Sequence, residues 1–309
     1  MNSPGGIGSV ARLPGGSMWA ELERLSEHGR GSSRPMFGPI RVTAATTPIG
    51  AYAEPRPALI AVAHGSRDPR SAATMSAVVA DIAAARPDID VRLAFLDLNA
   101  PSVEQVVTAT AAQGHTQAVV APLLLGSAYH ARVDLPGLLA AARTAHPQLL
   151  LTQADVLGPD PRLITTVRDR TLTALGPASG AQPRHGEPLG AAANVGVVVA
   201  AVGAASAAAN VRTGEVAGQL ATLTGWHTEI CFVTTEPSVT QAISRLRARG
   251  AERVLVAPWF LAPGRLTDRL LAATPDVAHA QVIGPDTVLT EIVWDRYDTA
   301  LSDALSLSA

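Results

Sequence analysis

The chain has 309 residues, enough for two domains of ordinary size that each bury a hydrophobic core. Its formal net charge is -2, and all 24 basic residues are arginine. The charge argues against nucleic acid or an anionic membrane as the main partner. The lack of lysine excludes a P-loop and a lysine Schiff base, because both need that amine. A single cysteine, Cys231, excludes an internal disulfide and fits a reduced, cytoplasmic protein.

Two segments have the composition of connecting chain rather than of a folded core. Residues 1–56 are rich in Gly, Ser, Pro and Arg and lack the apolar stretch of a signal peptide, so they are predicted to be a flexible extension. Residues 176–193 are rich in Gly, Pro and Ala and are predicted to be a linker. The expected organisation is therefore a first domain at 57–175 and a second at 194–309.

Within each domain, short aliphatic runs alternate with longer amphipathic segments. Runs without polar alternation indicate strands that are covered on both faces, as in a parallel sheet. The predicted strands are Ala58–Ala63, Val91–Leu96, Ala118–Ala121 and Leu149–Ala154, then Val195–Ala201, Thr228–Val233, Arg253–Ala257 and Ala280–Ile283. The predicted helices are Arg70–Ala85, Ser102–Gln113, Leu135–Ala145 and Pro161–Leu175, with helices between the later strands and a last one through Ile292–Ala304. This alternation predicts two tandem doubly wound α/β domains.

The second domain repeats the first but has lost its polar residues at three positions. These pairs are His64 with Val202, Asp97 with Val233, and His130 with Leu266. In the first domain, all three polar residues follow or end a predicted strand, and both intervals between them are thirty-three residues. Because parallel strands end at the same edge of a sheet, we expect these side chains to meet there.

Three segments of the first domain carry a resemblance to a known family: AHGSRDP at 63–69, FLDLNAPS at 95–102 and PLLLGSAYHARVDLP at 122–136. Together they closely resemble the sirohydrochlorin chelatases of the CbiX and SirB type, the class II chelatases of siroheme and cobalamin synthesis. The resemblance implies two fused flavodoxin-like halves with one working site. It also implies that His64 and His130 hold the incoming metal beside the macrocycle. Asp97 departs from the pattern, since the family often has glutamate there, and its reach is one methylene shorter.

The function expected on this basis is insertion of Fe²⁺ or Co²⁺ into sirohydrochlorin. His64 and His130 are the expected catalytic residues, because imidazole both binds such metals and accepts protons near neutral pH. The other expected site residues are Asp97 as a third metal ligand and, for the substrate, Ser66, Arg67, Ser127 and Arg132, with Arg70, Arg265 and Arg269 as further arginines that can bind carboxylates. No tightly bound cofactor is expected, since the divalent metal (Fe²⁺, Co²⁺ or Ni²⁺) is a substrate. We expect no nucleic-acid or membrane partner and a monomer or homodimer.

Several alternatives stay open at this point. One alternative is that the protein is a carrier, which binds tetrapyrrole or metal without turnover. Phosphohistidine chemistry is weakly suggested by His64-Gly65 beside arginine, and no close ligand cluster favours metal-dependent hydrolysis. Asp97 has two structural alternatives, as the cap of the helix near Ser102 or as the partner of an arginine. Structural roles are expected for the remaining histidines, which are His28, His115, His146, His185, His227 and His279.

Overall fold

A computed structural model describes residues 56–126, 130–176 and 194–308, without the side chains of His130, Ala131, Leu305, Leu307 and Ser308. The predicted N-terminal extension and nearly all of the predicted linker lie outside these residues, as does Ser127. The first half contains β1 (Ala58–Ala63), α1 (Pro69–Ala85), β2 (Val91–Phe95), α2 (Val103–Ala112), β3 (Gln117–Pro122), the π-helical turn η2 (His130–Asp134), α3 (Leu135–Ala145), β4 (Leu150–Gln153) and α4 (Pro161–Leu175). The second half contains β5 (Val195–Ala201), α5 (Ala207–Thr224), β6 (His227–Phe232), α6 (Val239–Ala248), β7 (Arg253–Pro258), α7 (Arg265–Ala273), β8 (Ala278–His279) and α8 (Thr287–Ser308).

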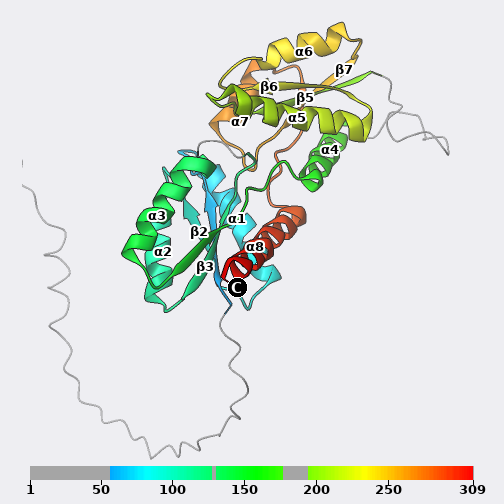
Figure 1. The fold of residues 1–309 in the computed structure, drawn as a ribbon. Helices are drawn as coiled ribbons and strands as arrows, with labels where there is room; N and C mark the ends of the chain where they lie inside the picture. The colour runs from blue at the N-terminus through cyan, green and yellow to red at the C-terminus, as the bar shows by residue number, and fades with distance from the viewer. Residues whose placement is uncertain (1–55, 127–129, 177–193, 309) are drawn as a thin grey trace, which may run out of the picture. The chain divides into compact units, whose positions relative to one another are not determined.

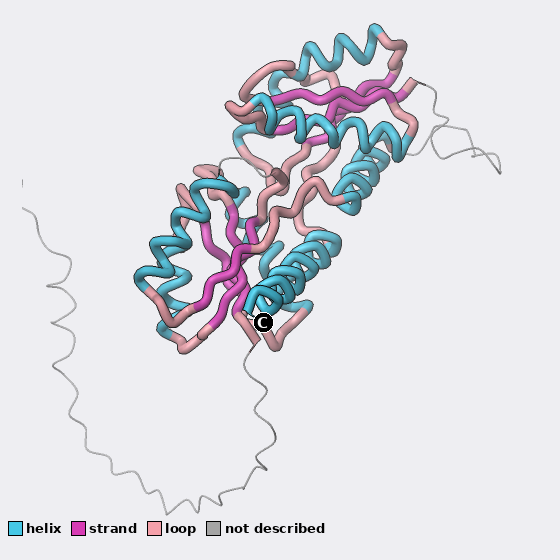
Figure 2. Tube along the Cα trace, in the orientation of Figure 1, coloured by secondary structure: helices cyan, strands magenta, loops and turns pink. Residues whose placement is uncertain are grey.

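Each half forms a parallel sheet of four strands, in the order β2-β1-β3-β4 and β6-β5-β7-β8 (Figures 1 and 2). The two sheets have equivalent registers. Ala61 pairs with Leu93 and Ala121, as Val199 pairs with Ile230 and Ala257. This is the flavodoxin-like order without its fifth strand. The predicted fold class of two tandem parallel α/β units is confirmed.

The order of each sheet reverses beside its first strand, so the connections leaving β1 and β3 run to opposite faces. A crevice at the carboxyl ends of the strands is therefore expected at this point, which is where doubly wound folds bind ligands. In the first half, the crevice lies between the segment after Ala63 and the segment after Pro122, since Val62 pairs with Pro122 across the two strands. The fold thus brings the two predicted histidine segments to adjacent strand ends.

The last helix of each half covers the sheet of the other half. Helix α8 contacts β3, β4 and α1, whereas α4 contacts β7, β8 and α5. Helices α2 and α3 cover the opposite face of the first sheet, and α6 and α7 cover that of the second (Figure 1). Because of this exchange, one continuous core contains residues of both sheets, including Leu59 and Val197 at the centre of each and Ile292 of α8.

One strand prediction was wrong. Residues Ala280–Ile283 were expected to form the last strand, but β8 is the two-residue strand Ala278–His279. The amides of Ala280 and Ile283 donate to Val256 O and Phe260 O, at 2.8 and 2.9 Å, so the chain follows the end of β7 without forming a ladder. Both residues are buried. The apolar run therefore indicated burial correctly but not the type of structure, which periodicity cannot distinguish over four residues.

No helix in the described part of the chain combines the length and the apolar character needed to cross a bilayer.

Candidate active site

His64 follows directly on β1, in a turn held by several hydrogen bonds. Its carbonyl accepts a hydrogen bond from Asp97 N at 3.0 Å. Two residues later, Ser66 N donates to Asn99 Oδ1 at 2.6 Å. The Ser66 hydroxyl accepts in turn from Asp68 N at 3.1 Å. The His64 side chain is exposed. The turn thus fixes the backbone that carries the imidazole while leaving the ring accessible.

Gly65 is required at this turn. Its φ is +95°, a left-handed conformation, and a Cβ built there would lie 1.8 Å from Asp97 O. The loop after β2 therefore packs against the glycine backbone itself. The equivalent Gly203 has φ +91°, so the second half keeps the turn geometry although Val202 has replaced the histidine.

His130 begins η2, the π-helical turn that leads into α3. Its side chain lies outside the described part of the structure, so the predicted pairing of the His64 and His130 rings stays a prediction. Among the described side chains, no three His, Cys, Asp or Glu residues gather as a metal site. Cys231 is fully buried, and burial raises the pKa of its thiol to about 12. That thiol therefore stays protonated at neutral pH and supplies no thiolate ligand.

Asp97 is exposed beyond the end of β2 and does not cap α2. Its Oδ1 accepts from Leu98 N at 2.7 Å, within the same turn. The cap of α2 is Ser102, whose hydroxyl and backbone amide form a reciprocal capping box with Gln105. The interpretation of Asp97 as a helix cap is therefore wrong. Its role as a metal ligand remains a prediction.

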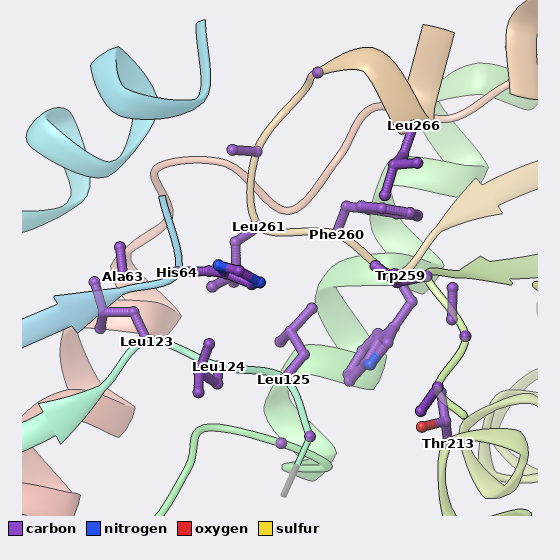
Figure 3. Close-up of a pocket in the computed structure, with 18 of the residues that line it drawn as sticks. Ala63, His64, Leu123, Leu124, Leu125, Thr213, Trp259, Phe260, Leu261 and Leu266 are labelled. Carbon is purple, nitrogen blue, oxygen red and sulfur yellow. The ribbon is translucent and has the colours of Figure 1, made fainter. Parts of the chain in front are cut away.

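A cavity of about 460 Å³ opens at this edge of the first sheet and is lined by residues of both halves (Figure 3). From the first half it is lined by His64, Ser66 and Arg132, all predicted site residues. The second half contributes Val202 and Leu266, the two apolar counterparts of the predicted histidines. His64 and its counterpart Val202 thus line a single cavity.

The walls of the cavity are mostly apolar. Leu123, Leu124 and Leu125 follow β3, and the equivalent segment after β7 supplies Trp259, Phe260 and Leu261. Figure 3 shows the His64 ring directed between these two segments. Such a volume with few polar groups is typical of a site for a small organic ligand.

The structure sorts the predicted arginines into different environments. Arg132 and Arg265 line the cavity, but Arg67 and Arg269, although exposed, are not among its lining residues. Arg70 was expected to contact substrate, but it binds Asp68 and Asp268, each at 2.6 Å. The hydrogen bond from Arg70 holds the pKa of Asp68 below its usual value.

The sequence analysis missed the contribution of α5. Asn210, Arg212 and Thr213 of this helix line the cavity. Their only signal in the sequence was a polar stretch in the first turns of a helix whose neighbours are mostly alanine. From the sequence alone, that stretch is typical of a solvated helix face. The tertiary structure places it at a cavity that residues of the other half also line.

Comparison with known proteins identifies the family. A family model described as CbiX matches residues 58–174 and matches again at residues 196–300. The chain belongs to the CbiX family. The double match also agrees with the duplication inferred from the sequence. The family predicted from the three motifs of the first domain is thereby confirmed.

Individual relatives of this CbiX-family chain carry chelatase names. It is 32% identical over 116 residues to a sirohydrochlorin ferrochelatase of Priestia megaterium. The matched stretch covers 37% of this chain but only 42% of the ferrochelatase. It is 26% identical over 137 residues to a sirohydrochlorin cobaltochelatase of Methanothermobacter thermautotrophicus, covering 40% of this chain and 95% of that protein. That relative is thus equivalent to one half of this chain.

Among solved structures, SirB from Bacillus subtilis with Fe³⁺ has a TM-score of 0.65 to this chain. The match covers 81% of this chain and 98% of SirB at 22% identity. At that identity, the likeness establishes the shared fold.

Proposed function

We propose that this protein inserts Fe²⁺ or Co²⁺ into sirohydrochlorin. The observation that carries the proposal is the asymmetry of the cavity, in which His64 of one half faces an apolar surface that contains its counterpart Val202. The flat faces of a macrocycle are apolar and can pack against the apolar walls of the cavity. The histidines of one half are enough to bind one metal ion. The names of the relatives, sirohydrochlorin ferrochelatase and cobaltochelatase, support the same reaction.

The chemistry requires three events. The metal loses solvent ligands, two pyrrole nitrogens lose their protons, and the ring distorts so that its lone pairs face the ion. Neutral histidine binds Fe²⁺ and Co²⁺ through nitrogen, and an incomplete ligand set lets the ion pass on to the macrocycle. His64 and His130 in this proposal hold the metal, with Asp97 as a third ligand. The same imidazoles accept the pyrrole protons, a role that histidine side chains commonly have near neutral pH.

The substrate is held by its polar rim in this proposal. Arg132 and Ser66 both line the cavity, and both present groups that hydrogen-bond to carboxylates. Arg67 and Ser127 belong to the same two segments in the sequence and are proposed to complete these contacts. The divalent metal is a second substrate, and no resident cofactor is required. Since one chain supplies both walls of the cavity, a monomer suffices, although a homodimer is equally compatible.

Replacing either histidine tests the proposal. His64→Ala and His130→Ala are expected to lower the rate of metal insertion by at least about tenfold, because acid–base groups typically contribute 10²-fold or more. Binding of the metal-free tetrapyrrole is expected to persist, since the walls remain. The measurement is stopped-flow absorbance with sirohydrochlorin and Fe²⁺, Co²⁺ or Ni²⁺ in parallel, without oxygen.

His146→Ala is the matched control, because His146 caps α3, bonds to Thr108 Oγ1 at 3.0 Å and is not a lining residue of the cavity. Unchanged turnover in both test variants would refute the roles assigned to the histidines. A wild-type protein that shifts the tetrapyrrole spectrum stoichiometrically and then stops would instead be a carrier. The relative rates with the three metals identify which ion is preferred.

A further inference from the structure

The cavity is cationic as well as apolar. Its described lining residues include Arg132, Arg212 and Arg265 and no aspartate or glutamate. Two of these three arginines belong to the second half, on α5 and at the start of α7. A pocket with apolar walls and several arginines favours a ligand that is an apolar anion.

Other arginines that connect the two halves are already neutralised by carboxylates. Arg70 binds Asp268 at 2.6 Å, Arg86 binds Asp298 at 2.6 Å, and Arg162 binds Asp295 at 2.7 Å. Arg170 likewise binds Asp286 at 3.1 Å. These ion pairs connect α1 and α4 to the second half.

Arg212 differs from them. It is exposed on α5, lines the cavity, and has no hydrogen bond or ion pair with any residue in the described ranges. A guanidinium carries five donors in a planar fork that matches a carboxylate in two parallel hydrogen bonds, and it always keeps its charge. Arg212 thus presents an unused anion-binding group at the wall opposite the histidine segments.

We propose that Arg212 binds a carboxylate of the tetrapyrrole, so that the half without the histidines anchors the substrate for the half that has them. This inference rests on the proposed function and assigns the second half its own part in it. Arg265, at the start of α7, is the second anchor of the same wall. Val202 is 43% exposed and lines the same cavity, so a bound ring covers it. The two halves in this arrangement divide metal handling from substrate binding.

The test is the affinity for sirohydrochlorin without metal, measured by absorbance titration on the full chain. Arg212→Gln is expected to raise the Kd about tenfold, because a hydrogen bond to a charged group contributes roughly one factor of ten or more. Arg212→Lys is expected to give an intermediate loss, since it keeps the charge but not the fork. Arg247→Gln is the control, as Arg247 is an exposed arginine of α6 that does not line the cavity and carries the same charge.

A Kd for Arg212→Gln within twofold of wild type overturns the inference. An equal loss in Arg247→Gln also overturns it, because the effect would then belong to net charge. Insertion assays on the same samples distinguish this result from the fate of the proposed function. If Arg212→Gln weakens tetrapyrrole binding but the wild-type protein inserts no metal, the role of Arg212 in binding stands and the proposed chelatase activity is refuted. If the wild-type protein inserts metal but Arg212→Gln binds the tetrapyrrole as wild type does, the chelatase activity stands and the role of Arg212 is refuted. If the wild-type protein does not bind the tetrapyrrole, both the proposed function and the role of Arg212 are refuted.

Discussion

At the scale of single residues, the accessibility of His64 depends on a neighbour without a side chain. Gly65 allows the loop after β2 to approach its backbone, and the carbonyl of Asp97 occupies the space of a Cβ. Asn99 then supplies the oxygen that accepts from Ser66 N. The backbone that carries the imidazole is therefore held by contacts between two neighbouring strand ends.

Gly65→Ala is expected to lower the free energy of unfolding by at least about 2 kcal/mol, because a left-handed φ and a backbone clash both oppose the new Cβ. Urea denaturation measures the effect. Gly218→Ala in α5 is the control, since its Cβ would meet nothing within 4 Å. That control should be neutral or stabilising by up to about 1 kcal/mol, the usual helix preference for alanine. Equal stabilities of the two variants would contradict the proposed close approach.

At the scale of elements, two helices of the first half begin with the same Asp-Pro-Arg sequence. Asp68 caps α1 and Asp160 caps α4, and both are nearly buried, at 8% and 6% exposure. In each motif the arginine binds back to the capping carboxylate and also reaches a carboxylate of the second half. The motif therefore combines a helix start with a cross-link between the halves.

Asp160→Asn tests the electrostatic part of this motif, because asparagine also caps helices well. Burial opposes ionisation of Asp160, but the hydrogen bonds from Arg162 outweigh it, and the pKa of the carboxyl is held below its usual value. A depressed folded pKa stabilises the protein above the unfolded value of about 3.9, and the contribution is lost as the pH falls through the folded pKa.

Asp160→Asn is therefore expected to cost about 1 kcal/mol at pH 7, in the range of a hydrogen bond to a charged group. Its difference from wild type should shrink as the pH falls from 5 toward 3. Urea unfolding across this pH range is the measurement. A difference that stays constant at every pH would show that the charge of Asp160 contributes nothing.

At the scale of the whole molecule, the exchange of α4 and α8 makes the two halves interdependent. Ile292, Val293 and Tyr297 of α8 are buried in the same core as β1 of the first half. Tyr297 OH also donates to Pro57 O at 2.5 Å, and burial raises the pKa of this phenol to about 12. On the face that belongs to the shared core, each sheet is covered partly by a helix of its own half, α1 or α5, and partly by a helix of the other half, α8 or α4.

We therefore expect residues 56–309 to unfold in one cooperative transition, although the sequence divides into two domains. Calorimetry should give a calorimetric enthalpy equal to the van't Hoff enthalpy, the signature of a two-state process. Residues 57–175 expressed alone lack α8 and are expected to bind a hydrophobic dye through the uncovered sheet. Two separate transitions, or a well-folded fragment, would show that the shared core does not couple the halves.

The sequence by itself determined the elements, the duplication and the family. Continuous aliphatic runs such as Val195–Ala201 are buried on both sides, so their strands follow from composition alone. The turn motif at His64 was equally readable, because its residues lie close together along the chain. The end of the second sheet could not be predicted in this way, since a short, mostly apolar stretch such as Ala280–Ile283 can be buried without forming a strand.

Only the tertiary structure decided which residues of the two halves share a cavity and which helices cover which sheet. Arg70 and Arg212 are both exposed arginines near the start of a helix, and no local pattern distinguishes them. Their roles diverge because Asp268, far along the chain, forms an ion pair with the first, whereas no described carboxylate forms one with the second. Contacts between residues about two hundred positions apart depend on how the two halves pack, and periodicity carries no information about that packing.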